Sequence, residues 1–184
     1  MPFVALHSKT QERVDITQIN ISDALTSDRY TCQLCNGEMY IRAVNSKYFQ
    51  PHFVHYAECV STYDHHPESL KHRLAKQHIR EQLIGRPNYQ EAVFHLEYIV
   101  PEAHRIADVY VKLLDGSTEV HEAQLASITT HELEQRTNDY GEAGLKTIWW
   151  LGGAAAHEHN KWWCSDRLGG CHLLSFSEAD NDQQ

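Results

Sequence analysis

Long hydrophobic runs are missing from this chain of 184 residues. No apolar stretch approaches the roughly 20 residues that a membrane-spanning helix needs, so we expect no contact with a membrane. Residues 1–7 lack the basic and long apolar segments of a signal peptide, which predicts a cytoplasmic protein. Internal repeats and low-complexity segments are missing too. The length suits one ordinary domain, or one domain with a small metal-stapled module.

Positive net charge is also absent. The formal net charge is −9 at pH 7, which argues against a protein that simply coats nucleic acid with positive charge. A nuclease remains compatible with this charge, because a metal site needs carboxylates and the bound cation reverses the local sign.

Alternating helical and strand-like patterns fill the second part of the chain, residues 62–176, before a polar tail at 177–184. The predicted elements are a helix over 67–84, strands over 89–100, 105–114 and 118–125, a helix over 129–143 and a strand over 146–151. Pro67 starts the first helix and Gly85 ends it, and Asp115-Gly116 forms a hairpin turn. This order predicts an α/β domain whose mixed sheet is flanked by helices.

Acidic residues lie on two neighbouring strands of that sheet. Asp108 lies within a strand, where Asp is uncommon, and Glu122 and Gln124 lie on one face of the next strand. If the register allows, both point at Asp108. Two carboxylates with nearby backbone oxygen suit Mg²⁺ or Mn²⁺, and such an ion can activate water against a phosphodiester. The alternative is a solvated face of an ordinary hairpin.

Cysteine and histidine mark the first part of the chain, residues 1–61, whose apolar content is low for a self-sufficient core. The chain has five Cys, an odd number that favours metal ligands or free thiols over a disulfide framework in a cytosolic protein. Cys32-x-x-Cys35 followed by Gly37 has the form of a zinc knuckle. We therefore predict a zinc-ribbon-like module with a structural Zn²⁺. The second ligand pair must come from three residues, His52, His55 and Cys59, with His65 and His66 as outside candidates.

The helix over 67–84 is the most basic stretch of this acidic chain. Its basic residues, which we expect to contact nucleic acid, are Lys71, Arg73, Lys76 and Arg80. Glu68, His72 and Lys76 are spaced one turn apart and share one face. An ordinary amphipathic helix with a solvated polar stripe is the alternative.

Taken in order, these pieces resemble the CoiA-like competence protein family, within the PD-(D/E)XK nuclease superfamily. The matching pieces span about residues 30–151 and are Cys32-x-x-Cys35, His52-Phe53-Val54-His55, Glu68-Ser69-x-x-His72-x-x-x-Lys76, Arg105-x-Ala107-Asp108-Val109, Glu122-x-Gln124-x-x-Ser127, Arg136 with Tyr140, and Trp149-Trp150-Leu151. Seven pieces in one order are far more specific than any one of them.

The resemblance implies a restriction-endonuclease-like core in which Asp108 and Glu122 bind the catalytic metal and Glu68 supplements it. It also implies His52 and His55 as the second zinc pair, with Cys59 as the alternative ligand. Gln124 stands where many relatives carry a catalytic Lys. We expect Gln124 to orient water by hydrogen bonding, Lys76 to restore the missing cation, and His72 to contact phosphate or orient Glu68.

Three functions follow as hypotheses, and the third is an interaction protein whose carboxylates lie only at the surface, which the net charge of −9 supports. The first is a divalent-metal-dependent nuclease that hydrolyses single- or double-stranded DNA, with RNA less favoured, in DNA uptake or in defence against foreign DNA. The second is a nuclease-like module that has lost catalysis and binds DNA, a partner protein or a second copy of itself. Gln124 in place of Lys supports the second hypothesis. For Arg136 and Tyr140 we favour a helix surface pair over direct catalysis, and Cys164, Cys171 and His172 stay unassigned.

Overall fold

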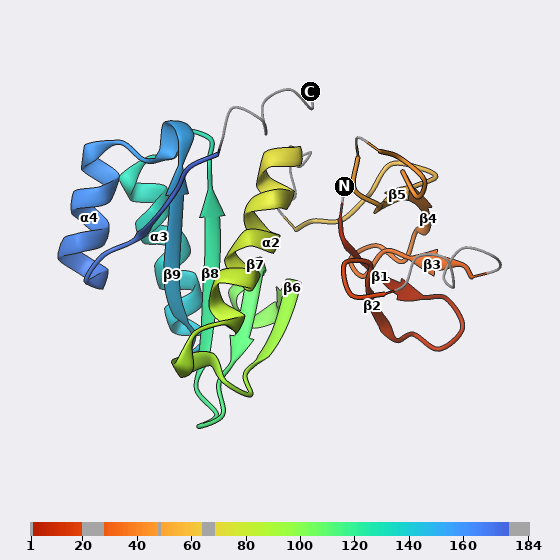
Figure 1. The fold of residues 1–184 in the computed structure, drawn as a ribbon, viewed down its shortest axis with the longest axis horizontal. Coiled ribbons are helices and arrows are strands. Elements are labelled where there is room, and N and C mark those ends of the chain that lie inside the picture. The colour runs from red at the N-terminus through yellow and green to blue at the C-terminus, as the bar shows by residue number, and fades with distance from the viewer. Residues whose placement is uncertain (1, 20–27, 48, 64–68, 177–184) are drawn as a thin grey trace. The chain divides into compact units, whose positions relative to one another are not determined.

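The structure is a computed structural model that describes residues 2–19, 28–47, 49–63 and 69–176 (Figure 1). The described residues divide into two compact units, one up to residue 63 and one over 69–176. The predicted tail at 177–184 lies outside the described residues. Within the part that the structure describes, no helix is long and apolar enough to cross a membrane.

The N-terminal unit is built on a five-stranded sheet of short strands with the order β2-β1-β3-β4-β5. These strands are β1 (Val4–His7), β2 (Arg13–Asp15), β3 (Tyr30–Thr31), β4 (Glu38–Arg42) and β5 (His52–His55). All of their pairings are antiparallel. The core of the sheet is small, with Phe3 and Phe53 fully buried and Phe53 packed on Tyr30, which agrees with the low apolar content of this part of the sequence.

The second unit has a mixed five-stranded sheet with the order β10-β9-β8-β7-β6. Its main elements are α2 (Leu70–Ile84), β6 (Val93–Val100), β7 (Arg105–Lys112), β8 (Thr118–Gln124), α3 (Thr130–Glu142), β9 (Lys146–Gly152), α4 (Glu158–Leu168) and β10 (His172–Leu174). Strands β6, β7 and β8 are antiparallel neighbours, whereas β8 and β10 pair with β9 in parallel. The predicted α/β domain with a mixed sheet is confirmed, and so is the order of its first six elements.

Helices cover both faces of this sheet (Figure 1). Helix α2 contacts β7 and β8, and α3 contacts β9. Ser69 begins α2 by accepting a hydrogen bond from the backbone N–H of His72, and Thr129 forms a capping box with Glu132 at the start of α3. Buried Ile79 and Leu83 of α2 and buried Leu133 and Tyr140 of α3 supply the apolar contacts.

A local distortion interrupts the sheet next to the predicted acidic residues. The register of β6 and β7 is continuous on both sides of Glu97 and Asp108, but these two facing residues do not pair. Glu97 has a φ of 52°, the left-handed conformation that non-glycine residues rarely adopt within a strand. The ladder between β7 and β8 also stops at the pair of Val109 with His121. The strands therefore separate at Asp108, which leaves backbone groups there for side chains to satisfy.

Candidate functional site

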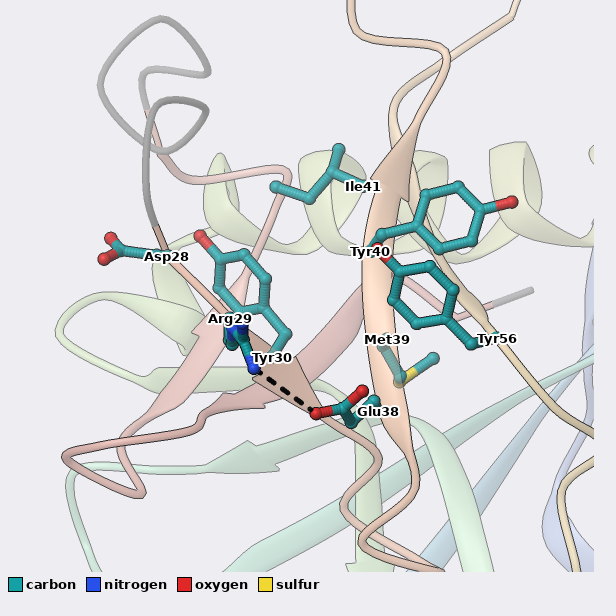
Figure 2. A pocket seen from close by; sticks show the side chains of 8 residues that line it. All are labelled: Asp28, Arg29, Tyr30, Glu38, Met39, Tyr40, Ile41 and Tyr56. Carbon is teal, nitrogen blue, oxygen red and sulfur yellow. Dashed lines mark ion pairs between the residues drawn. The ribbon is translucent and has the colours of Figure 1, made fainter.

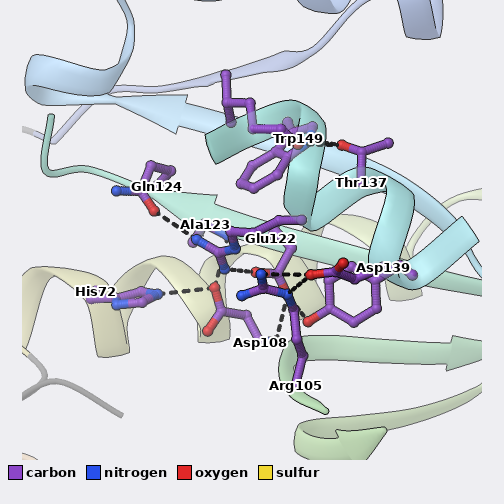
Figure 3. Close-up of polar contacts among 12 residues, drawn as sticks. His72, Arg105, Asp108, Glu122, Ala123, Gln124, Thr137, Asp139 and Trp149 are labelled. Carbon is purple, nitrogen blue, oxygen red and sulfur yellow. Dashed lines mark hydrogen bonds and ion pairs between the residues drawn. The ribbon is translucent and has the colours of Figure 1, made fainter. Parts of the chain in front are cut away.

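Asp108 lies in the interruption of the sheet and is held from two sides (Figure 3). Its Oδ2 atom is 2.9 Å from Nε2 of His72 on α2 and accepts a 2.8 Å hydrogen bond from the backbone N–H of Ala123 on β8. Burial by itself would raise the pKa of this carboxyl, but the charge and hydrogen bond of His72, the charge of Lys76 and the Ala123 N–H outweigh burial and lower the pKa to about 2. Asp108 is therefore an ionised carboxylate at neutral pH.

Glu122 fills the other side of the same interruption. Its Oε1 atom accepts hydrogen bonds from the backbone N–H of Asp108 at 3.2 Å and from the Tyr140 hydroxyl at 3.0 Å. Burial raises the pKa of this fully buried carboxyl, while the Arg136 guanidinium opposes that shift and Asp108 adds to it. Each acid is thus bonded to the other acid's strand. Asp108 of β7 accepts from a backbone N–H of β8, and Glu122 of β8 accepts from a backbone N–H of β7.

Arg136 of α3 is the cation nearest to the second acid. One guanidinium nitrogen is paired with Oε2 of Glu122, and the other donates a 3.2 Å hydrogen bond to Oε1 of Gln124. The guanidinium also lies 5.1 Å from the ring centroid of Trp149, a cation–π distance. Gln124 in turn donates to the carbonyl of Ala126, so the amide is oriented toward Arg136. Our preference for a helix surface pair is wrong for Arg136 and Tyr140, since both side chains contact Glu122.

Lys76 and Arg73 are buried, contrary to the expectation of a phosphate-facing surface. Each residue is only 2% exposed. Nζ of Lys76 donates to Oε1 of Glu97 at 2.6 Å, and both side chains are inside the unit. The cause is helical geometry, because positions 73, 76, 79 and 83 share the face that packs on the sheet. Lys71 and Arg80 are half-buried and remain candidates for contact with nucleic acid, whereas Glu68 lies outside the described residues.

In the N-terminal unit, four side chains form a group that could hold a metal ion. They are Cys32, Cys35, His55 and Cys59, and one ligand atom from each lies within 4.8 Å of the others. Sγ of Cys35 is 3.4 Å from Nε2 of His55. Three thiolates and one imidazole are a donor set of structural zinc sites.

The loop from Cys32 to Gly37 is shaped around the sulfur atoms. Backbone N–H groups of Leu34 and Gly37 donate to the sulfur atoms of Cys32 and Cys35 at 3.3 and 3.4 Å. A Cβ atom at Gly37 would lie 3.2 Å from Sγ of Cys35. Glycine therefore lets the backbone approach this sulfur atom closely. These contacts stabilise negative charge on the two sulfur atoms, which is the charge that metal-bound thiolates carry.

His52, one of the two favoured histidine ligands, is not a member of this group; Cys59 takes that place. His52 is buried, and its Nδ1 atom lies 2.8 Å from the carbonyl of Gln50. His52 and His55 are three residues apart in β5, and side chains of a strand alternate between its faces. The two histidines therefore point to opposite sides, and only His55 meets the cysteines. His65 and His66 lie outside the described residues.

Sequence reasoning missed Glu97 and undervalued Arg136. Glu97 lies in an aromatic and β-branched run, where a single acid looks like a solvated strand residue, and its left-handed backbone leaves no mark in the pattern. For Arg136 a signal was available, because Arg136 and Tyr140 lie one turn apart on α3 and therefore face the same strand.

The fold and the site together define an α/β domain with two linked carboxylates at a break in its mixed sheet. The family model described as "Competence protein CoiA, nuclease-like domain" matches residues 68–173, more than half of the chain. The chain therefore belongs to this family, as its motifs predicted. No curated protein and no solved structure matches the chain.

Proposed function

We propose that this protein is a divalent-metal-dependent nuclease of the PD-(D/E)XK type that hydrolyses phosphodiester bonds in DNA, in DNA uptake or in defence against foreign DNA. The observation that carries the proposal is the reciprocal bonding of Asp108 and Glu122 at the break in the sheet. Asp108 N–H donates to Glu122, and Ala123 N–H donates to Asp108. Two carboxylates are thereby held in one place inside a domain of a nuclease-like family.

The donor set at this break fits a hard divalent cation. Asp108 and Glu122 would hold Mg²⁺ or Mn²⁺, which prefer carboxylate oxygens. When bound, such an ion supplies an activated water and stabilises negative charge on the phosphodiester. Both acids already lie near positive charge, Asp108 near His72 and Lys76 and Glu122 near Arg136, so negative charge at this site is balanced by cations.

We assign to Arg136 the positive charge that a catalytic Lys would supply and that Gln124 lacks. The guanidinium hydrogen-bonds to Gln124 and to Glu122, so it lies where a Lys at position 124 would act. A guanidinium binds phosphate oxygens through two donors. Gln124 keeps the role of orienting the guanidinium or a water. Lys76, which is paired with Glu97, instead lowers the pKa of Asp108 from inside the domain.

Cys32, Cys35, His55 and Cys59 form the second metal site of the proposal. Four protein ligands would complete the tetrahedral shell of Zn²⁺, which gives that ion a structural role. In a unit with so small a buried core, the metal would supply much of the folding free energy.

A nuclease-like module without catalysis is the second candidate, and one observation favours it. Glu122 is paired with Arg136, and its other oxygen is engaged by Tyr140 and Asp108 N–H. If Arg136 does not release Glu122, the carboxylate cannot bind a metal. The protein would then use the same fold to hold DNA or a partner protein.

A cleavage assay separates the two candidates. The purified full-length protein is incubated with single- and double-stranded DNA and RNA, with Mg²⁺ or Mn²⁺, beside an Asp108→Ala/Glu122→Ala double variant. We expect metal-dependent cleavage by the wild type and a loss of about a thousandfold or more in the double variant. Glu134→Gln, which removes an exposed acid of α3, controls for the loss of a carboxylate outside the site and should cleave normally. No cleavage of any substrate would leave only the binding module.

A further inference from the structure

The N-terminal unit has a surface hollow of about 340 Å³ that the sites described above do not use. Eight residues line it, from segments 28–30 and 38–41 and from position 56 (Figure 2). They comprise three tyrosines, two aliphatic or thioether side chains and three charged side chains: Tyr30, Tyr40, Tyr56, Met39, Ile41, Asp28, Arg29 and Glu38. Tyrosine rings beside charged side chains suit a flat polar molecule, because the rings can stack on its plane and the charges can bind its edge.

Two of these tyrosines form a tilted aromatic pair. The ring centroids of Tyr40 and Tyr56 are 4.8 Å apart with an angle of 42° between the rings, and both rings lie on one side of β4 (Figure 2). Tyr56 is 71% exposed. Tyr56 therefore contacts Tyr40 with its ring tilted and presents much of its own surface to solvent. A further planar group can stack on that exposed surface.

Two members of the Cys/His group flank Tyr56 in the sequence. Tyr56 directly follows His55 and precedes Cys59 by three residues, and both of these are members of the Cys/His group. Its backbone N–H donates to the carbonyl of Glu38 at 3.1 Å. The backbone of Tyr56 is thus ordered before binding, which reduces the conformational entropy that a stacked ligand would cost.

The charged rim offers hydrogen bonds of both kinds. Arg29 and Glu38 are 82% and 68% exposed, and their closest charged atoms are 3.8 Å apart. Such an exposed pair is weak, so both groups can bind a ligand. A guanidinium is a donor to phosphate, and a carboxylate accepts from the amino group of a base.

We propose that this hollow binds an unstacked base of a single-stranded nucleic acid, with the base stacked on Tyr56. A duplex keeps its bases stacked on one another, so it cannot present one to the ring. The inference rests on the proposed nucleic-acid function and adds the strandedness of the substrate. The carboxylates of Asp28 and Glu38 predict a preference for bases that carry amino groups over thymine or uracil.

The test measures binding to the full-length chain in an Asp108→Asn/Glu122→Gln background, so that cleavage does not consume the probe. Fluorescence anisotropy follows labelled single-stranded DNA, the matching RNA and a DNA duplex. Tyr56→Ala should weaken single-strand binding about tenfold, the range that one stacked base contributes. Tyr56→Phe keeps the ring and should stay within about twofold of the parent. Trp162→Ala, which removes a 69% exposed aromatic ring from α4, is the control and should change nothing.

The outcomes separate this inference from the nuclease proposal. Equal affinity of Tyr56→Ala and the parent, or equal affinity for duplex and single strand, would overturn the inference even if the wild type cleaves DNA. Tyr56-dependent single-strand binding by a protein that cleaves nothing would support it and defeat only the nuclease activity. The DNA and RNA arms show which strand supplies the base, since the stacking chemistry is common to both.

Discussion

The two candidate metal sites of this protein differ in what surrounds their ligand atoms. In the N-terminal unit, Cys32, Cys35, His55 and Cys59 converge on one another, and backbone N–H groups donate to two of the sulfur atoms. In the second unit, Asp108 and Glu122 are each engaged by a side chain of a helix, His72 and Arg136. The first group is arranged for a metal as it stands, whereas the second must exchange a protein cation for a metal ion.

This difference teaches how charge is held in each unit. Four converging ligands would make a metal part of the fold, because the free energy of binding the ion then contributes to the free energy of folding. In the second unit, Asp108 and Glu122 already have cationic partners, so we expect this unit to stay folded without a metal. A metal ion would then compete with those cations for the carboxylates. We therefore expect a metal to stabilise the N-terminal unit at the first site and to exchange with protein cations at the second, and three predictions test that contrast.

The largest effect is expected at the Cys/His group. Cys59→Ser should reduce bound zinc from one per chain to well under one and unfold the N-terminal unit, because structural zinc contributes on the order of 10 kcal/mol to small metal-bound folds. The second unit should stay folded. Elemental analysis measures the zinc, and hydrogen exchange measures the two units separately.

His52→Asn is the matched control for this prediction. His52 is a buried histidine of the same strand as His55 but is not a member of the group, so the variant should keep its zinc. Loss of zinc in His52→Asn with full zinc in Cys59→Ser would show that the ligand set is wrong.

An intermediate effect is expected from Arg136→Gln in the second unit. The substitution leaves the fully buried Glu122 carboxylate without its cation, which typically costs about 3–5 kcal/mol. Millimolar Mg²⁺ should restore part of this loss, because the ion replaces the missing charge. Urea unfolding with and without Mg²⁺ measures both effects.

Arg105→Gln provides the comparison for Arg136. Arg105 pairs with Asp139 at 2.6 Å, but the two side chains are 20% and 31% exposed, so this variant should lose only about 1 kcal/mol and gain nothing from Mg²⁺. Equal losses in the two variants, or no effect of Mg²⁺ on Arg136→Gln, would contradict the exchange of cations at Glu122.

The sequence predicts much of the second unit because its patterns are local. Helical spacing, the Asp115-Gly116 turn and strand alternation place α2, β7, β8 and α3 within a few residues of their observed bounds. The short strands β2, β3 and β5 carry too few residues for a periodic pattern, and α4 has no apolar stripe that separates it from a polar loop.

The candidate site was predictable only in part, for reasons of geometry. Asp108 and Glu122 could be placed on neighbouring strands, but their reciprocal bonding depends on the break at Glu97, which needs a left-handed residue that no motif announces. Strand alternation could have separated His52 from His55, had β5 been recognised as a strand. Lys76 is buried because it lies on the face of α2 that packs on the sheet. The sequence does not determine which face this is, because polar and apolar residues are mixed around the helix.

The smallest effect is expected at Glu119, a buried acid of β8 that has partners of its own and no role in the proposed metal site. Interaction with His121, followed by hydrogen bonds from Lys146 and Tyr89, outweighs burial and lowers the pKa of Glu119 from 4.5 to about 2. A depressed carboxyl pKa stabilises the fold above the ordinary pKa, and this stabilisation is lost as the pH falls from about 4.5 to about 2.

Glu119→Gln should therefore lower the free energy of unfolding by at most about 3 kcal/mol at pH 7 and by almost nothing near pH 2. Urea unfolding from pH 2 to pH 7 gives the difference between wild type and variant, in which the titration of the other carboxylates cancels. Mg²⁺ should not restore this variant as it restores Arg136→Gln, and if it does, the metal is not confined to Asp108 and Glu122.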